Sequence, residues 1–392
     1  MSSETSVLQT NTLEGETVNT IINLLIIEDE NGQIEQIEDA INDFNRKTGK
    51  PDGINIQIRT VKTFSDAIFA LLKDEFDAAI IDLKLNGTSG DDEGVSLIEI
   101  IIDRLRFPIF VRSGFPEKVE FLSSEHEFVK VFKKTDKVDL IISEIIKFHS
   151  NGITATIGTK GKVEKYLNKI FWSSFSKNVH LWDKELLDNN EYEKSLVRYC
   201  LALLQEHLEV EENGGDFSDY HPFEVFISPP IKSNHFFGDI LYDDFNYHII
   251  LSPACDMAQE KYEKIIIAQI EPLDTIASFI EHQQRYNEKD LSNTKKEKAK
   301  KKVIEFLTNN YNDKYHYLPK YMEFPGGLIN FQKIQSKTKE ELDGMKRFAS
   351  ISGKFSKDIG ARFSNYFARQ GQPNLNIDVL LKTILDINDE EE

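Results

Sequence analysis

The sequence has few residues that would form covalent cross-links and no segment that would anchor it in a membrane. Its 392 residues include two cysteines, Cys200 and Cys255. Two cysteines cannot form a disulfide framework, which is typical of an intracellular protein. No apolar run approaches the roughly 18 residues of a membrane-spanning helix. The first twenty residues are polar and acidic, without the apolar segment of a signal peptide. We therefore expect a cytoplasmic chain.

Basic residues are outnumbered as well. The chain has 47 Lys and Arg against 66 Asp and Glu, a net charge of −19. Such a charge disfavours nonspecific binding of nucleic acid. A lysine run at 295–302 is usually a solvated helix face, so nucleic-acid binding through it is the less favoured interpretation. No helix-turn-helix motif appears that would indicate a DNA-binding output.

Short apolar runs in the first 150 residues end in chemically active side chains. A buried parallel strand reads as a continuous apolar run, and ligands bind at the carboxyl ends of such strands. The runs are LLIIEDE (24–30), ending in Glu28, Asp29 and Glu30; AIIDLKL (79–85), containing Asp82; PIFVRSG (108–114), with Ser113; and VFKKTD (131–136), with Lys133 and Lys134. With the strand INIQIRTV (54–61) and helical stretches between them, five βα units predict a doubly wound α/β sheet.

These strand ends suggest phosphoryl chemistry. Neighbouring carboxylates repel one another and favour a hard dication such as Mg²⁺, which takes oxygen ligands. A carboxylate can then accept a phosphoryl group covalently. A lysine ammonium would neutralise the phosphoryl oxygens, and a serine hydroxyl would donate a hydrogen bond to one of them. Solvated strand ends without function are the alternative interpretation, but four of them in this order make it less favoured.

The order of these residues over about 21–150 resembles the receiver domain of bacterial response regulators. The resemblance implies Glu28, Asp29 and Asp82 as Mg²⁺ ligands, and Asp82, Ser113 and Lys134 as the phospho-acceptor, hydroxyl and lysine. It also implies a histidine kinase or ATPase-kinase as partner and allows a homodimer through the receiver.

Some positions depart from the receiver pattern. Thr135 follows the lysine where proline is usual, and Lys133 leaves the register uncertain by one residue. Arg112 is unusual before the hydroxyl residue. The loop 86–94 is long and acidic, with Asp91, Asp92 and Glu93.

Two further regions follow the receiver pattern. ITATIGTKGK (153–162) has the composition of a linker, and 163–210 is mostly helical, with Trp172 and Trp182 expected in the core. Strands are then expected at 223–230, 238–245, 247–254, 264–272 and 327–336, with a basic helix at 295–311 and a helical tail at 340–385. The expected divisions are a disordered N-terminus at 1–20, a receiver at 21–150, a linker and helical connector at 151–215, an α+β output module with a small SH3-like barrel at 216–385 and an acidic tail at 386–392.

The last region resembles the PemK-like toxin fold, a small SH3-like barrel. The resemblance covers roughly 222–370 and rests on Gly238-Asp239-Ile240, IILSP (249–253), KIIIAQIEPL (264–273) and INFQKIQSKTKEEL (329–342). Proteins of that family cut single-stranded RNA, using an Arg-Pro pair at the second strand. Asn246-Tyr247-His248 stands there instead, so RNase activity is not carried over.

Two motifs in the same region have competing interpretations. In one interpretation Cys255 and Asp256, with or without His248, form a thiol–carboxylate site, but a buried cysteine with Asp256 capping a turn is favoured. Phe363, Tyr366 and Phe367, flanked by Arg362 and Arg369, fit a packed C-terminal helix capped at Gly371 better than a partner surface.

The sequence therefore predicts a phosphorylation-regulated protein of a two-component or phosphorelay system of bacterial type. Its C-terminal module would respond to phosphorylation, and the architecture resembles receivers of defence-type gene pairs. A receiver-gated RNA-cutting or other hydrolytic effector is one alternative, and a pseudo-receiver scaffold is another. Whether the chain is an enzyme stays open.

Overall fold

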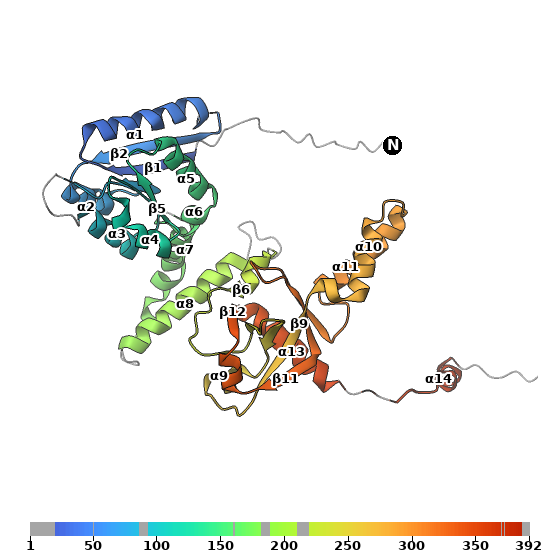
Figure 1. Cartoon of the computed structure of the whole chain (residues 1–392). Coiled ribbons are helices and arrows are strands. Elements are labelled where there is room, and N and C mark those ends of the chain that lie inside the picture. Colours follow the sequence, from blue (N-terminus) through green and yellow to red (C-terminus); the bar gives the residue numbers. More distant parts are fainter. Residues whose placement is uncertain are drawn as a thin grey trace, which may run out of the picture. The chain divides into compact units, whose positions relative to one another are not determined.

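The computed structural model describes residues 20–49, 51–85, 93–159, 161–181, 189–209, 219–369, 371 and 373–385. The chain divides into two compact units, residues 1–217 and 218–392 (Figure 1). We describe each unit by itself. Several predictions fall outside the described residues: the disordered segment up to residue 19, the acidic loop at 86–92, Trp182, the turn at 214–216 and the tail at 386–392.

Unit 1 contains a parallel sheet of five strands in the order β2-β1-β3-β4-β5. The strands are β1 (Thr20–Ile27), β2 (Ile54–Val61), β3 (Ala78–Ile81), β4 (Ile109–Ser113) and β5 (Val129–Lys133). All four residues of β3 are buried, because the strand has neighbours on both sides and helices over both faces. The predicted five-stranded parallel sheet is confirmed.

Helices cover both faces of this sheet (Figure 1). One face packs against α1 (Asn31–Phe44) and α5 (Val138–Ser150), with Ile37, Ile41 and Ile141 buried beneath them. The other face packs against α2 (Phe64–Lys73), α3 (Glu93–Arg104) and α4 (Glu120–Glu125). Two short helical segments lie in the connections: Asn45–Gly49 (η1) between α1 and β2, and Pro116–Lys118 (η2) between β4 and α4. The two cores fix the strand ends relative to one another.

The predicted linker at 153–162 is helical over its first half. Residues Ile153–Ile157 form a helix, α6, whose first N–H is capped by the Asn151 side chain at 2.9 Å. Ile153 and Ile157 are one turn apart and line an apolar hollow together with Ile101 and Val129. The isoleucine spacing, rather than the Gly and Thr content, determines the structure of this segment.

The described residues between 162 and 209 are mostly helical, as predicted. They comprise α7 (Lys162–Ile170), η3 (Phe171–Phe175), η4 (Ser176–Leu181) and α8 (Asn189–Glu209). The expectation that Trp172 lies in the core is wrong, because its side chain is 67% exposed. It packs edge-to-face against Phe171, which is also exposed, while Ile170 is the buried residue of this stretch.

Unit 2 contains a curled, antiparallel sheet of seven strands in the order β10-β11-β9-β8-β7-β12-β6. The strands are β6 (Phe226–Ile227), β7 (Asp239–Tyr242), β8 (Tyr247–Ile250), β9 (Ile265–Glu271), β10 (Tyr315–Leu318), β11 (Gly327–Lys337) and β12 (Lys346–Ile351). The register between β11 and β9 shifts between Ile329 and Ile334. The closed SH3-like barrel stays a prediction.

Strand β12 corrects the prediction of a helical tail from residue 340. Its Ala349 and Ile351 are buried and alternate with less buried neighbours, which is the pattern of a strand. The strand lies between β7 and β6. Because β12 is short and lies between two helices, the flanking helical pattern obscured it.

A buried ion pair joins β12 to β7. Asp239 is fully buried, and its Oδ2 lies 2.9 Å from Arg347 Nε. The Ser350 hydroxyl donates to Asp239 Oδ1 at 2.6 Å, and the Phe236 N–H donates to Oδ2 at 2.7 Å. The carboxylate is therefore compensated, as burial of a charge requires.

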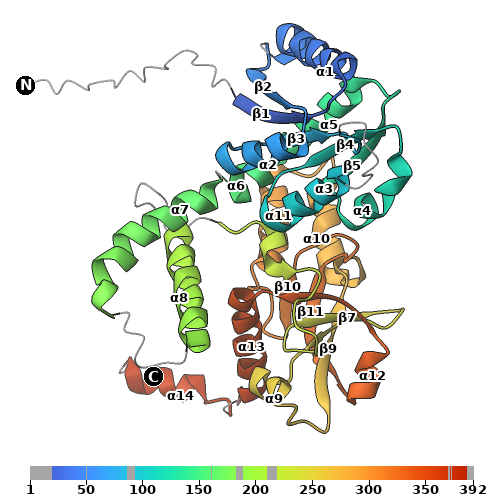
Figure 2. The same ribbon diagram turned by 90° about the vertical axis from the view of Figure 1, so that its left-hand side faces the viewer.

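Helices flank the sheet of unit 2 (Figure 2). They are η6 (Pro222–Val225), α9 (Ala254–Ala258), η7 (Leu273–Thr275), α10 (Ala277–Asn287), α11 (Asn293–Leu307), α12 (Lys339–Asp343) and α13 (Gly353–Ala368). The last helix, α14 (Ile377–Ile384), has no buried residue. The lysine run lies on α11, where Lys302 pairs with Glu305 at 2.8 Å. No described helix is long and apolar enough to span a membrane.

The aromatic–arginine stretch forms a helix that packs through Phe363 and Tyr366, as the favoured interpretation expects, whereas Phe367 is 54% exposed. Phe363 and Tyr366 of α13 lie 5.5 and 6.1 Å, between ring centroids, from Phe331 in the core. Arg362 donates to the main-chain oxygen of Asn309 at 2.9 Å. Gly371 does not cap this helix, because α13 already ends at Ala368.

Candidate functional site

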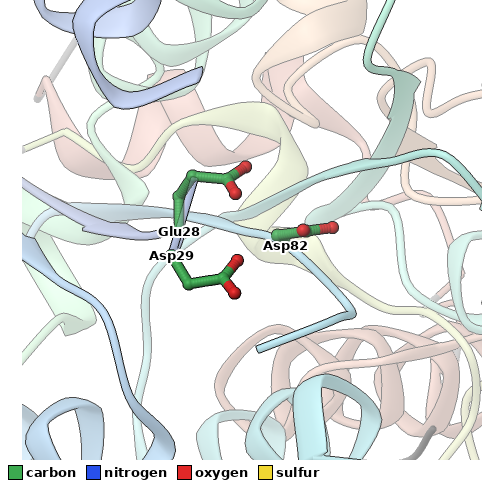
Figure 3. Close-up of side chains that lie close together, drawn as sticks. All are labelled: Glu28, Asp29 and Asp82. Atoms are coloured by element: carbon green, nitrogen blue, oxygen red, sulfur yellow. The ribbon is translucent and has the colours of Figure 1, made fainter. Parts of the chain in front are cut away.

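Three carboxylates meet at the carboxyl ends of β1 and β3. Ile27 of β1 pairs with Ile81 of β3, so the residues that follow them emerge at one edge of the sheet. Glu28, Asp29 and Asp82 each offer an oxygen, and these oxygens lie within 4.8 Å of one another (Figure 3). The parallel register thus brings together residues that are 54 positions apart.

Two of these carboxylates are almost completely buried. Glu28 is 2% exposed and Asp82 is 3% exposed. Asp82 Oδ1 is buried and has no hydrogen-bond partner, although such an unpaired polar atom costs about 1–3 kcal/mol or more. This oxygen is therefore available to bind a metal ion or another electrophile.

Lys134 is the cation of the cluster. Its Nζ lies 2.9 Å from Asp82 Oδ2 and 3.2 Å from Glu28 Oε2. Lys133 is exposed, and its main-chain N–H is bound by the Asp136 side chain at 2.8 Å. Of the two lysines, Lys134 is therefore the one whose ammonium contacts the carboxylates.

The cluster shifts the pKa values of its members. Burial raises the pKa of the Glu28 carboxyl from its ordinary 4.5 to about 7, and the Asp82 charge adds to the increase. Burial lowers the pKa of Lys134, but the hydrogen bond and charge of Asp82 and the charge of Glu28 raise it overall above 10.5. The lysine therefore stays charged, whereas Glu28 titrates near neutral pH.

Ser113 lies at the end of β4, next to β3 in the sheet. The residue is 1% exposed, and its hydroxyl oxygen accepts a hydrogen bond from the Phe115 N–H at 3.2 Å. Within the described residues, no hydrogen bond joins Ser113 to Asp82. The structure places the hydroxyl at the correct sheet edge, and its role stays a prediction.

The carboxylates fit a hard divalent cation. All three offer oxygen atoms, as Mg²⁺ requires, and the orphaned Asp82 oxygen would gain the partner it lacks. Among the described residues, this is the only group of three or more potential metal-ligating side chains that converge in this way. The residues that the sequence predicts as Mg²⁺ ligands are thus the ones that the fold brings together.

Sequence reasoning noted Arg112 as unusual but gave it no role. The side chain is 1% exposed and contacts Gln33, Gln36 and the main-chain oxygen of Lys134. The signal in the sequence was a charged residue inside an otherwise apolar strand. The two glutamines carried no comparable signal, because polar residues are common on the exposed face of a helix.

The Cys255-Asp256 motif of unit 2 does not form a site with His248 in the structure. Cys255 is exposed, so the expectation of a buried cysteine is wrong; the residue lies on α9, a one-turn helix at the surface. Its Sγ lies 3.7 Å from Asp256 Oδ1. His248 is buried and its Nε2 bonds to Asp243 Oδ2 at 2.8 Å instead.

Comparisons with known proteins give matches in solved structures. No family model and no curated protein matches the sequence. The receiver domain of the Erythrobacter litoralis response regulator PhyR is 24% identical over 33% of this chain and 92% of its own, with a TM-score of 0.26. A CheY-like receiver domain from Methylobacillus flagellatus is 20% identical over 32% of this chain and 99% of its own, with a TM-score of 0.25. The Francisella response regulator 1452 receiver domain is 17% identical over 33% and 98%, with a TM-score of 0.26. The N-terminal third is thus similar to receiver domains.

Proposed function

We propose that this chain is a phosphorylation-regulated signalling protein in which Asp82 accepts a phosphoryl group. The observation that carries the proposal is the environment of Asp82. It is a buried carboxylate with one oxygen held by Lys134 Nζ at 2.9 Å and the other without a partner. A carboxylate so placed has a free lone pair beside a fixed cation, which are the two elements that phosphoryl transfer to an aspartate needs.

The step is a displacement at phosphorus. An Asp82 oxygen forms a new O–P bond, and the bond between phosphorus and the donor breaks, with the electron pair leaving on the donor. With acetyl phosphate, the products are the aspartyl phosphate and acetate. Lys134 neutralises the added charge, since a phosphoryl group brings about −1.5 to −2 charges, and the Ser113 hydroxyl is the proposed hydrogen-bond donor.

Glu28, Asp29 and Asp82 would hold Mg²⁺. When bound, the ion offsets negative charge on the phosphoryl oxygens. The residues of the chain contribute the oxygen ligands, and the burial of Glu28 and Asp82 excludes water from two of them. Ionisation of Glu28 near pH 7 makes this ligand set dependent on pH.

The direct test is incubation of the full chain with acetyl phosphate, with and without Mg²⁺. We expect the intact mass to increase by one phosphoryl group only when Mg²⁺ is present. The adduct should survive acid and be lost in base, as an acyl phosphate is. A protein that gains no mass under these conditions, and whose amide spectrum is unchanged by beryllofluoride, would refute the proposal and favour the pseudo-receiver scaffold.

Mg²⁺ is expected to stabilise unit 1 by mass action. At a free concentration about 100 times its Kd, the ion should add about 2.7 kcal/mol to the free energy of unfolding. Replacing Asp29 with asparagine removes one charged ligand and should reduce this gain. Thermal unfolding at several Mg²⁺ concentrations measures both effects. An identical midpoint with and without millimolar Mg²⁺ would contradict the metal site.

Unit 2 is the proposed responding module. Val131 of β5 packs on the opposite face of the sheet, whereas Phe110 of β4 and Phe132 of β5 pack on the face beneath α5, which is followed by Gly152 and α6. Phosphorylation at Asp82 would change this face, and so either dimerisation through the receiver or the contacts of the helical connector at 163–210. A histidine kinase or ATPase-kinase is the partner we propose, in a gene pair of the defence type. Hydrogen exchange on both forms identifies the segments that respond.

The PemK-like relationship of unit 2, with its SH3-like barrel, stays part of the proposal. Within the described residues, the hydrolytic alternative gains no support. His248 bonds to Asp243, and the exposed Cys255 lies beside the Asp256 carboxylate without a hydrogen bond to a histidine. We therefore favour regulated interaction over RNA cutting.

A further inference from the structure

Arg112 is a buried charge that the proposed phosphoryl chemistry does not use. It lies on β4 directly before Ser113 and is 1% exposed. Burying a charged group costs several kcal/mol unless good partners compensate it. A sheet of this type needs only an apolar residue at such a position. The partners of the guanidinium should therefore indicate what the residue does.

The guanidinium connects three segments of unit 1. Nη1 donates to Gln33 Oε1 at 2.5 Å, and Nη2 donates to Gln36 Oε1 at 2.7 Å. Both glutamines lie on α1, just after the acidic cluster. Nη2 also donates to the main-chain oxygen of Lys134 at 2.7 Å. All three acceptors are neutral, and this planar fork of donors is something that lysine cannot supply.

These bonds hold the base of Lys134 on both sides. The Lys134 N–H donates to the main-chain oxygen of Ser113 at 3.2 Å, and its C=O accepts from Arg112. Strand β5 ends at Lys133, so the Lys134 N–H makes the last bond of the sheet and its C=O depends on Arg112. Two consecutive residues of β4 thus clamp the main chain from which the Lys134 ammonium reaches Asp82 and Glu28.

We propose that Arg112 is a positioning residue, which anchors the Lys134 main chain to α1 and so places the Lys134 ammonium at Asp82. The role in catalysis rests on the proposed phosphorylation of Asp82. A displacement of about 1 Å in a catalytic group can cost about 100-fold in rate. Without this bond, Lys134 keeps its charge, but its main chain is no longer held in one position.

The kinetic test compares R112M, K134A and the double variant by the rate of phosphorylation from acetyl phosphate at saturating Mg²⁺. We expect R112M to lower the rate at least about ten-fold, and to lower it no further in the K134A background. R112K should recover part of the rate, because its ammonium can still reach the Lys134 carbonyl. Equal effects of R112M in both backgrounds would overturn the proposal.

A matched control separates anchoring from general loosening. Q36L removes one contact to α1 but leaves the bond to the Lys134 carbonyl, so its rate should stay within about two-fold of the parent. The Kd for Mg²⁺ should not rise in R112M, because the carboxylates come from β1 and β3 and the loss of the Arg112 charge near Glu28 and Asp82 favours a bound cation. A fall in rate and Mg²⁺ affinity together would indicate a merely structural role and overturn the proposal.

A second readout does not depend on phosphorylation. In R112M, the Lys134 amide should exchange with solvent at least about ten-fold faster than in the parent, with β1 amides unchanged. If R112M does not fold, R112K replaces it, and the expected increase is about three-fold. Unchanged exchange at Lys134 would overturn the anchor. A parent protein that accepts no phosphoryl group would instead refute the proposed function, and the exchange data would still decide whether Arg112 holds this loop.

Discussion

Replacing Asp82 with asparagine is expected to abolish phosphorylation of the chain. The substitution keeps the size and shape of a side chain that is 3% exposed, so the surrounding core should remain intact. It removes the carboxylate oxygen that forms the bond to phosphorus, and a neutral amide is a poor nucleophile and a weak partner for a cation. Intact mass after incubation with acetyl phosphate and Mg²⁺ measures the outcome.

Asp77 provides the matched control for this experiment. It precedes the same strand, β3, but lies at the opposite end, where its Oδ2 accepts the Asn23 N–H at 2.8 Å. Asparagine can accept the same bond, so D77N should take up the phosphoryl group at the parental rate. If D82N still gains a phosphoryl group that base removes, the acceptor is another carboxylate and the assignment of Asp82 is wrong.

Replacing Glu28 with glutamine is expected to stabilise the metal-free protein at pH 8. In the folded chain the pKa of Glu28 is about 7, compared with an ordinary value of 4.5. Between these values the folded state binds the extra proton, so the free energy of unfolding falls as pH rises from about 4.5 to 7. The loss is on the order of 3 kcal/mol. Glutamine cannot ionise, so E28Q should lack this decline.

The measurement is the free energy of opening of the slowest β3 amides, by hydrogen exchange in a chelator across this pH range. Parent and variant should agree near pH 4.5 and separate above it. Adding Mg²⁺ at pH 8 should raise the free energy of opening more in the parent than in E28Q, because the metal binds the ionised carboxylate. Parallel pH curves for the two proteins would show that Glu28 does not titrate in this window.

The sheet of unit 1 and the location of its site could be predicted because the relevant signals are local. A buried parallel strand reads as an apolar run, and Asp82 ends such a run. Parallel order then places Glu28 and Asp82 at one edge. The choice between Lys133 and Lys134 could not be made, because alternation carries no information where a strand ends. Contacts with Asp82 and Glu28, which are distant in sequence, decided it.

Other features depend on contacts that a single sequence does not contain. Trp172 is a large apolar residue that is nevertheless 67% exposed, and Cys255 lies on a surface helix although cysteine is usually buried. The anchor made by Arg112 needs two glutamines one turn apart on α1 and a carbonyl beyond β5. Periodicity can indicate that a helix face is polar, but it does not show which distant group the face will bind.

The pairing of β7 with β12 has a consequence for the time course of synthesis. Asp239 and Ser350 are 111 residues apart in sequence. At about 5–20 residues per second, a ribosome needs on the order of ten seconds to make the chain between them. During this interval β7 has β8 on one side and an open edge on the other, and open edges can pair with other chains. Arg347 and Ser350 are also still missing, so Asp239 must keep its water until β12 emerges.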